Sequence, residues 1–146
     1  MPLLNYLTKV PASRTASQVQ TLLVKAGARG VGMVFDEHGA LTGMNFAVLT
    51  PYGRQTFVLP VNVAAVQAVL ERQRVDRRLR TAAHAERVAW RIVKDWVEAQ
   101  LALLSTEMVT LDQIMLPYMD SGDGSTVYDH FVGQRLALES GNGEHR

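Results

Sequence analysis

Residues 31–59 read VGMVFDEHGALTGMNFAVLTPYGRQTFVL, and apolar residues recur at every second position in three parts of this stretch. A period of two is typical of β-strands with one buried face. Two turn sequences separate the parts, DEHG at 36–39 and TPYG at 50–53, and the second has the Pro and Gly positions of a type I turn. The stretch therefore predicts a three-stranded antiparallel meander that ends at Pro60, which has no backbone donor. The alternating residues are Val31, Met33, Phe35, Met44, Phe46, Val48, Phe57 and Leu59.

A helix is predicted before the meander, over residues 13–27. Its apolar residues Val19, Leu22, Leu23 and Ala26 have helical spacing. The sequence TASQ at 15–18 fits a capping box, in which Thr15 would satisfy free backbone donors. Gly27 stands where a left-handed C-cap is needed.

Helices are also predicted after the meander. Asn62 is expected to cap one whose apolar face ends at Leu70, and Thr81 to cap another over 82–104. Residues 71–80, ERQRVDRRLR, either extend the first of these helices or form a mobile linker. The helix predicted over 82–104 would be roughly 35 Å long, which is longer than the sheet it could cover. Part of it is therefore expected to contact another helix or another subunit.

The rest of the chain predicts shorter helices. Residues 110–113, TLDQ, form a capping box for a short helix that Pro117 ends. Residues 120–125 have loop composition, Thr126 can start a last helix, and residues 141–146 are expected to be disordered. The expected fold is α+β, in the order α-β-β-β-α-α with a short helical C-terminal part. Its 146 residues suit one domain, with a core over 13–70 and a helical part over 82–136.

Composition excludes several classes of protein. The chain has no Cys, which excludes disulfides, thiolate zinc sites and Cys nucleophiles. No apolar run approaches the roughly 18 residues of a membrane span, and no secretory signal is evident. We therefore expect a cytoplasmic protein with no membrane partner, in the host cell if the chain is phage-encoded.

Catalytic and metal sites are not indicated. The four His residues are far apart, the aspartates at 120, 123 and 129 lack EF-hand spacing, and the glycines at 27, 30 and 32 precede a strand instead of following one. No Ser lies in a nucleophile-elbow context. The sequence predicts no metal, no cofactor and no catalytic residue.

Charge is distributed unevenly along the chain. Residues 1–94 hold 13 basic and 5 acidic residues, a balance of +8, and residues 95–146 hold 2 basic and 9 acidic residues, a balance of −7. This asymmetry favours a polyanion partner, head-to-tail self-association or mutual neutralisation within one fold. The basic residues are mostly Arg, whose planar group suits phosphate.

The strongest functional signal is a basic run around residues 72–94. A basic helix face can track a phosphate backbone, and the same cluster could hold a small nucleotide or an acidic protein patch. The alternative is a solvated face with pairs such as Lys94 with Glu98. The run consists of Arg72, Arg74, Arg77, Arg78, Arg80, Arg87, Arg91 and Lys94.

Two aromatic residues are candidates for stacking on bases. Trp90 lies beside the basic residues and is either a packing residue, the favoured interpretation, or a stacking platform. Tyr52 is expected to be exposed at the tip of the second turn. Trp96 is expected in the core.

Two resemblances bear on function. The order of elements is similar to that of the double-stranded-RNA-binding domain, but residues 62–66 lack that family's basic cluster and DEHG replaces its Gly-Pro-x-His loop, so membership is rejected. The phrases RTAS at 14–17, KAGA at 25–28, FDEHG at 35–39, FVLP at 57–60 and VAWRIVKDWVEAQ at 88–100 resemble uncharacterised small proteins of tailed phages and prophages. That resemblance covers about residues 13–130, implies a phage accessory role, and supplies no functional residues.

Three functions are therefore expected from the sequence. The first is a non-enzymatic phage accessory protein that binds nucleic acid through the basic run, so that changing Arg77, Arg78 and Arg87 together weakens binding. The second is an anti-defence protein that sequesters a nucleotide signal or inhibits a host complex. The third is a structural homo-oligomer that associates through helix 82–104.

Overall fold

The computed structural model describes residues 1–144, and the chain is an α+β protein with the predicted order of elements. Within these residues, no helix combines the length and apolar composition needed to cross a membrane. The elements are α1 (Ala12–Lys25), β1 (Arg29–Phe35), β2 (Leu41–Thr50), β3 (Gly53–Pro60), α2 (Val63–Arg72), the 3₁₀ helix η1 (Arg77–Leu79), α3 (Ala82–Leu104), α4 (Leu111–Met115), the 3₁₀ helix η2 (Leu116–Tyr118) and α5 (Val127–Glu144).

The three strands form one antiparallel sheet with β2 in the middle, which confirms the predicted meander. Met44, Phe46 and Val48 of β2 are buried on one face, as their alternation predicts. The rings of Phe46 and its partner Phe57 on β3 stack with centroids 5.5 Å apart. Aromatic pairs of this kind across a strand pair add to the stability of the sheet.

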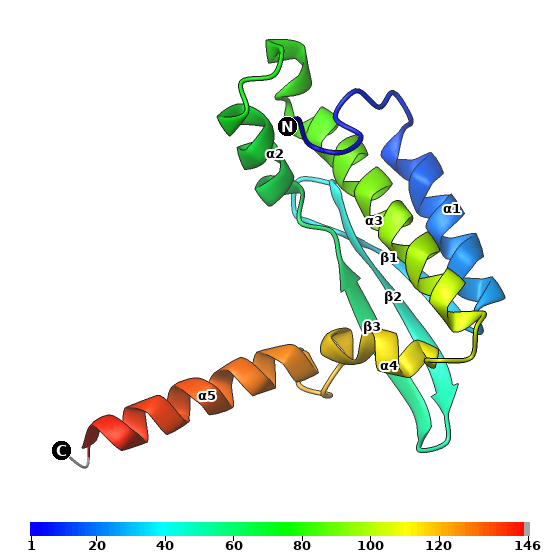
Figure 1. The fold of residues 1–146 in the computed structure, drawn as a ribbon, viewed down its shortest axis with the longest axis vertical. Helices are drawn as coiled ribbons and strands as arrows, with labels where there is room; N and C mark the ends of the chain where they lie inside the picture. Colours follow the sequence, from blue (N-terminus) through cyan, green and yellow to red (C-terminus); the bar gives the residue numbers. More distant parts are fainter. Residues whose placement is uncertain (145–146) are drawn as a thin grey trace.

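Helices α1 and α3 lie side by side over this apolar face (Figure 1). Val19 and Leu23 of α1 and Val97 of α3 are fully buried against the sheet in one core. Trp90 of α3 is also completely buried, and its indole Nε1 donates to the carbonyl oxygen of Leu41 at 2.9 Å. Trp96, expected in the core, packs at its edge and remains half-buried.

The length of α3 is accounted for within the chain. Its two neighbours are α1 along one side and α2 near its beginning, and the sheet lies beneath it. Few of its residues are exposed beyond its first turn, and those lie in its second half. The helix contact expected from its length is therefore intramolecular, and oligomerisation through 82–104 stays a prediction.

Most predicted helix ends are confirmed. The side chains of Asn62, Thr81 and Thr110 accept hydrogen bonds from Ala65, His84 and Gln113, and Thr110 forms the expected capping box. Gly27 has a φ of +109°, and the Gly27 and Ala28 amides close the last turn of α1 on Val24 and Leu23. This arrangement is a Schellman motif, which needs the left-handed residue that Gly supplies.

The capping box predicted at Thr15 is wrong. Helix α1 begins at Ala12, after Pro11, and no side chain caps it. Thr15 is instead fully buried in the first turn, and its hydroxyl has no hydrogen-bond partner among residues 1–144. Pro11 occupies the N-cap position, where its carbonyl oxygen accepts from the amides of Arg14 and Thr15, so the helix begins one turn before the predicted cap.

Residues 73–81 are neither a continuation of α2 nor an unstructured linker. Helix α2 ends at Arg72, and Asp76 caps η1 by accepting a hydrogen bond from the Arg78 amide. Arg80 donates through Nε to the carbonyl oxygen of Val75, and Gln67 donates to the carbonyl oxygen of Arg80. These bonds give the connection from α2 to α3 a defined shape.

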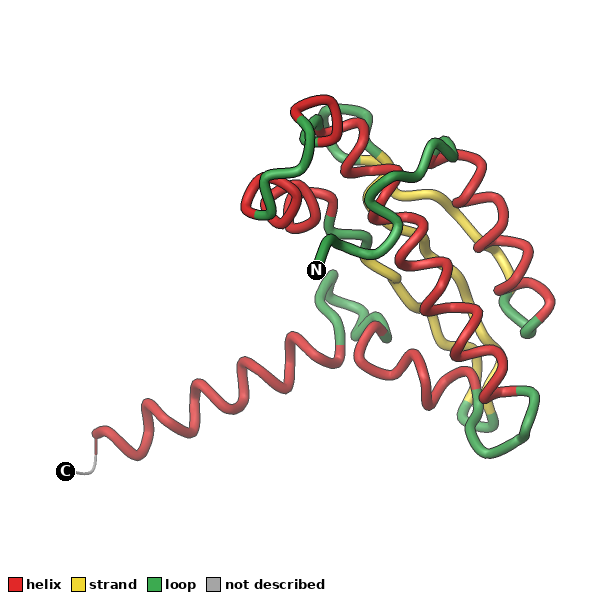
Figure 2. Tube along the Cα trace, turned by 45° about the horizontal axis from the view of Figure 1, so that its top comes forward, coloured by secondary structure: helices red, strands yellow, loops and turns green. Residues whose placement is uncertain are grey.

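The C-terminal part runs beside the sheet and then leaves it. Leu111 and Met115 of α4 join the core, and Asp120 donates its amide to Thr56 on the edge of β3. Helix α5 then projects away from the rest of the molecule (Figures 1 and 2). It continues to Glu144, the disorder expected for residues 141–146 stays a prediction, and residues 145–146 lie outside the described part.

Gly43 is expected to be intolerant of substitution because β3 lies close to it. A Cβ at Gly43 would lie 2.9 Å from the carbonyl oxygen of Leu59, which is backbone in a paired strand and cannot move alone. We expect Gly43→Ala to lower the free energy of unfolding by about 1–3 kcal/mol, measured by urea denaturation. Gly32→Ala is the matched control, because its Cβ would meet only the exposed Asn45 side chain, which can rotate. Equal losses in the two variants would contradict this explanation.

Candidate anion-binding site

The N-terminal segment folds against the α2–α3 connection at one end of the molecule. The amide of Leu3 donates to Gln73 Oε1 at 2.8 Å, and Gln73 Nε2 donates to the carbonyl oxygen of Met1 at 3.1 Å. The segment thereby forms one side of two neighbouring clefts. One of them has a volume of about 400 Å³ and no carboxylate in its lining, and we call it the cationic cleft. Its lining residues are Leu7, Thr8, Lys9, Arg78, Leu79, His84 and Arg87.

A buried histidine positions one of the cations. His84 is only 3% exposed, with Nε2 lying 2.6 Å from the carbonyl oxygen of Tyr6 and Nδ1 lying 3.2 Å from the Arg87 guanidinium. A carbonyl oxygen only accepts and a guanidinium only donates. The neutral His84 tautomer with its hydrogen on Nε2 therefore satisfies both contacts. Arg87 is left with further N–H groups for a ligand.

Arg78 enters the cationic cleft from η1, where it also pairs with Asp76. Its Nη2 and Nε lie 3.1 and 3.3 Å from the two carboxylate oxygens of Asp76. Hydrogen bonds from Arg78 lower the pKa of Asp76, and the side-chain bonds raise the pKa of Arg78. The Arg78 side chain is 86% exposed, so the pair is screened by water and adds little stability. Arg78 can therefore also contact an anion in the cleft, and weakening its pair with Asp76 costs little free energy.

The structure divides the predicted basic run into three groups. Arg78 and Arg87 line the cationic cleft, and Arg72, Arg74 and Arg77 are exposed nearby on α2 and the α2–α3 connection. The latter three form no ion pair with any residue of 1–144. We call these five residues, together with Lys9, the basic end.

The third group is committed to contacts within the fold. Arg80 holds the carbonyl oxygen of Val75, and Arg91 donates to Gln18 Oε1 on α1 at 2.9 Å. Lys94 pairs with Glu98 one turn later, which confirms the alternative interpretation for that residue. The helix face formed by Arg87, Arg91 and Lys94 is therefore not a continuous free basic surface, because α1 covers part of it.

Neither aromatic candidate lies at the basic end. The stacking interpretation of Trp90 is wrong, because a side chain with no exposed surface cannot stack on a base, and the favoured packing interpretation is confirmed. Tyr52 is 89% exposed as expected. It lies in the β2–β3 turn, at the opposite end of the sheet from the α2–α3 connection (Figure 1).

Sequence reasoning missed the two other titratable residues that line the cleft, Lys9 and His84. Lys9 belongs to the segment before α1, which has no periodicity that would place it. His84 is the third residue of α3, and its role depends on Tyr6, which is distant in sequence. Only the fold brings these segments together.

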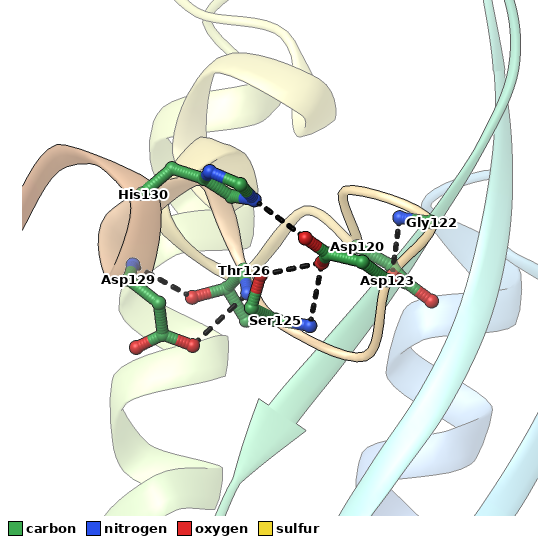
Figure 3. A network of polar contacts seen from close by, with 7 residues as sticks. All are labelled: Asp120, Gly122, Asp123, Ser125, Thr126, Asp129 and His130. Carbon is green, nitrogen blue, oxygen red and sulfur yellow. Dashed lines mark hydrogen bonds and ion pairs between the residues drawn. The ribbon is translucent and has the colours of Figure 1, made fainter. Parts of the chain in front are cut away.

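A second polar cluster lies between η2 and α5 (Figure 3). Asp123 accepts hydrogen bonds from the Ser125 amide and hydroxyl and lies 3.1 Å from His130 Nε2. The Ser125 hydrogen bonds are the main cause of a lowered pKa at Asp123, with a smaller contribution from His130. Thr126 and Asp129 exchange hydrogen bonds as a cap, which confirms Thr126 as the start of the last helix.

This cluster shapes the beginning of α5. Asp120 and Asp123 accept from amides two residues further on, as turn residues do. Across residues 1–144, no group of three or more potential metal-ligating side chains comes together. The cationic cleft is therefore the best-formed candidate site.

Comparison of the chain with protein-family models, curated proteins and solved structures gives no significant match.

Proposed function

We propose that this protein binds nucleic acid without chemical conversion, with the cationic cleft gripping a phosphate and the exposed arginines following the backbone. The observation that carries the proposal is the cleft itself, in which Lys9, Arg78 and Arg87 converge with no lining carboxylate. Guanidinium groups donate to phosphate oxygens in pairs and form stronger hydrogen bonds than neutral donors.

The surroundings of the cleft support a polymer as ligand. Arg72, Arg74 and Arg77 are exposed within a few residues of Arg78 and form no ion pair with the described residues. A single phosphate needs no such additional cations, whereas a backbone with repeated charges gains from each of them. A phage accessory role in replication or recombination is the setting that we propose for this activity.

A second candidate is binding of a small nucleotide, as an anti-defence protein would do. The cationic cleft has a volume of about 400 Å³, which lies in the range of small-molecule sites. Leu7 and Leu79 add apolar surface beside the cations. In this case short nucleotides bind as tightly as long strands.

Salt dependence tests the proposal. We expect fluorescently labelled single- and double-stranded oligonucleotides to bind, with log K falling linearly with log salt concentration. Because three cleft cations and three exposed arginines are available, the slope for duplex DNA is expected between about −3 and −5. Anisotropy titrations over several salt concentrations give this slope.

The alternatives have distinct outcomes in the same titrations. Competition by a mononucleotide or a short oligonucleotide at equal affinity would support nucleotide binding. No binding to either class at low salt would overturn the nucleic-acid proposal and leave a protein partner or a structural homo-oligomer as the function to test.

A further inference from the structure

Helix α5 presents an uncovered apolar surface. It contacts the rest of the chain chiefly through η2 at its beginning, and it extends away from the body in both views (Figures 1 and 2). Tyr128, Phe131, Leu136 and Leu138 are each 56–61% exposed. Helical spacing places Tyr128, Phe131 and Val132 on one side of the first two turns, and Arg135 and Glu139 follow on that side further along the helix.

This surface needs a partner for a physical reason. Most helical stability in proteins comes from packing of one helix face, and α5 has little of its surface packed. Gly133 and Gly141 lower the helix propensity of α5 further. Covering the apolar side of α5 would therefore stabilise it.

The direction of α5 is fixed at its beginning. The Thr126–Asp129 cap and the Asp123–His130 contact hold its first turn (Figure 3). The amide of Val127 also donates to the carbonyl oxygen of Met119 at 2.9 Å. Because α5 points away from the α2–α3 connection (Figure 1), it does not lie against the basic end of its own chain.

Charge and shape relate α5 to the basic end of the molecule. Residues 120–139 carry four carboxylates, at Asp120, Asp123, Asp129 and Glu139, against the single base Arg135. The basic end carries the opposite charge. Beside the cationic cleft lies a second cleft of about 600 Å³, lined largely by apolar residues such as Tyr6, Leu7, Val75 and Leu79, and its one lining carboxylate, Asp76, is paired with Arg78. An acidic arm with exposed apolar side chains at Tyr128, Phe131 and Val132 matches a basic surface with an apolar cleft.

We infer that α5 and the loop before it form an arm that docks onto the basic end of a second copy of this chain. The docked arm places its apolar side chains in the apolar cleft and its carboxylates near Lys9 and Arg78. An arm and a basic end are different surfaces, so the contact is either exchanged reciprocally in a dimer or propagated head to tail. Docking and nucleic acid then compete for the same cations, although the self-association itself does not depend on the proposed function.

The test is sedimentation velocity on the full chain without nucleic acid. We expect mass to increase with protein concentration at low salt, and this association to weaken as salt rises. Phe131→Glu, at an exposed position of the arm, is expected to weaken association about 30-fold, as loss of an interface anchor does. The pair Lys9→Glu and Arg78→Glu is expected to abolish it from the other side.

Mixing the two variants makes the test specific. The Phe131→Glu chain keeps an intact basic end, and the Lys9→Glu/Arg78→Glu chain keeps an intact arm, so the mixture is expected to form a heterodimer that neither variant forms alone. Arg29→Glu/Arg54→Glu, with the same change in charge at exposed positions of the sheet, is the control and should associate like the unmodified chain.

Two results would overturn the inference. A chain that stays monomeric up to about 1 mM has no specific self-association of this kind. Continued association of the Lys9→Glu/Arg78→Glu chain would show that α5 pairs with itself or with another surface. Nucleic-acid binding that persists in a strictly monomeric chain would leave the proposed function intact while removing the arm contact.

Discussion

Trp90→Ala is expected to lower the free energy of unfolding by about 4 kcal/mol. Trp90 has no exposed surface and lies among the core residues that join α3 to the sheet. Its replacement removes the largest side chain of the core and leaves a cavity. It also removes the 2.9 Å hydrogen bond to the carbonyl oxygen of Leu41. Urea denaturation followed by far-ultraviolet circular dichroism measures the loss.

Two further variants separate the contributions. Trp90→Phe keeps most of the apolar volume but removes the indole donor, so its cost is expected to be the smaller, about 1–3 kcal/mol for an unpaired buried carbonyl plus the reduced volume. Tyr52→Ala is the control for loss of an aromatic ring, since Tyr52 is almost fully exposed, and it should change stability by less than about 0.5 kcal/mol. A Trp90→Ala protein as stable as the Tyr52→Ala protein would contradict the burial of Trp90.

The second large effect is on ligand binding. Lys9→Glu/Arg78→Glu is expected to weaken nucleic-acid binding by about 100-fold or more at low salt. Each charge-assisted hydrogen bond to a phosphate is worth about 1.5–3 kcal/mol, and every 1.4 kcal/mol is tenfold in affinity. Lys9 and Arg78 are both exposed, so the fold is expected to be unaffected. Anisotropy titration gives the affinity, and an unchanged melting temperature confirms the fold.

Two further variants test whether the change in net charge alone explains the loss of affinity. Arg29→Glu/Arg54→Glu changes the net charge equally but lies outside the cleft, and its affinity should fall far less. Asp76→Asn should strengthen binding, because it removes the carboxylate that now pairs with Arg78 while an Asn can still cap η1. If both charge-reversal pairs weaken binding equally, binding is a property of overall charge and the cleft is not its site.

Much of the fold could be predicted from the sequence because it rests on local rules. Alternation at period two placed the three strands, and the turn residues at 36–39 and 50–53 joined them. Asn62, Thr81, Thr110 and Thr126 each began a helix because a side-chain oxygen satisfies free amides there. Thr15 fitted the same pattern and failed, because Pro11 had already started α1 and the first turn placed Thr15 in the core.

The candidate site was only partly predictable. The basic run indicated the region, but helix periodicity alone could not show that α1 covers part of the α3 face or that Arg91 and Lys94 have partners. Nor could it show that Trp90, which lies beside basic residues in the sequence, faces the sheet.

The sequence by itself determined the order of the elements, the buried faces of β2 and β3 and most helix ends, since each depends on residues a few positions apart. It was wrong for Phe35 at the end of β1, which is 61% exposed beyond a register shift in the pairing with β2. The tertiary structure decided which cations are free. It brought Tyr6 against His84, residues far apart in sequence, and so oriented Arg87 beside Lys9 and Arg78. It also left α5 without a neighbour along most of its length. Local spacing sets what a segment can form, and packing between distant segments sets which side chains remain available to bind.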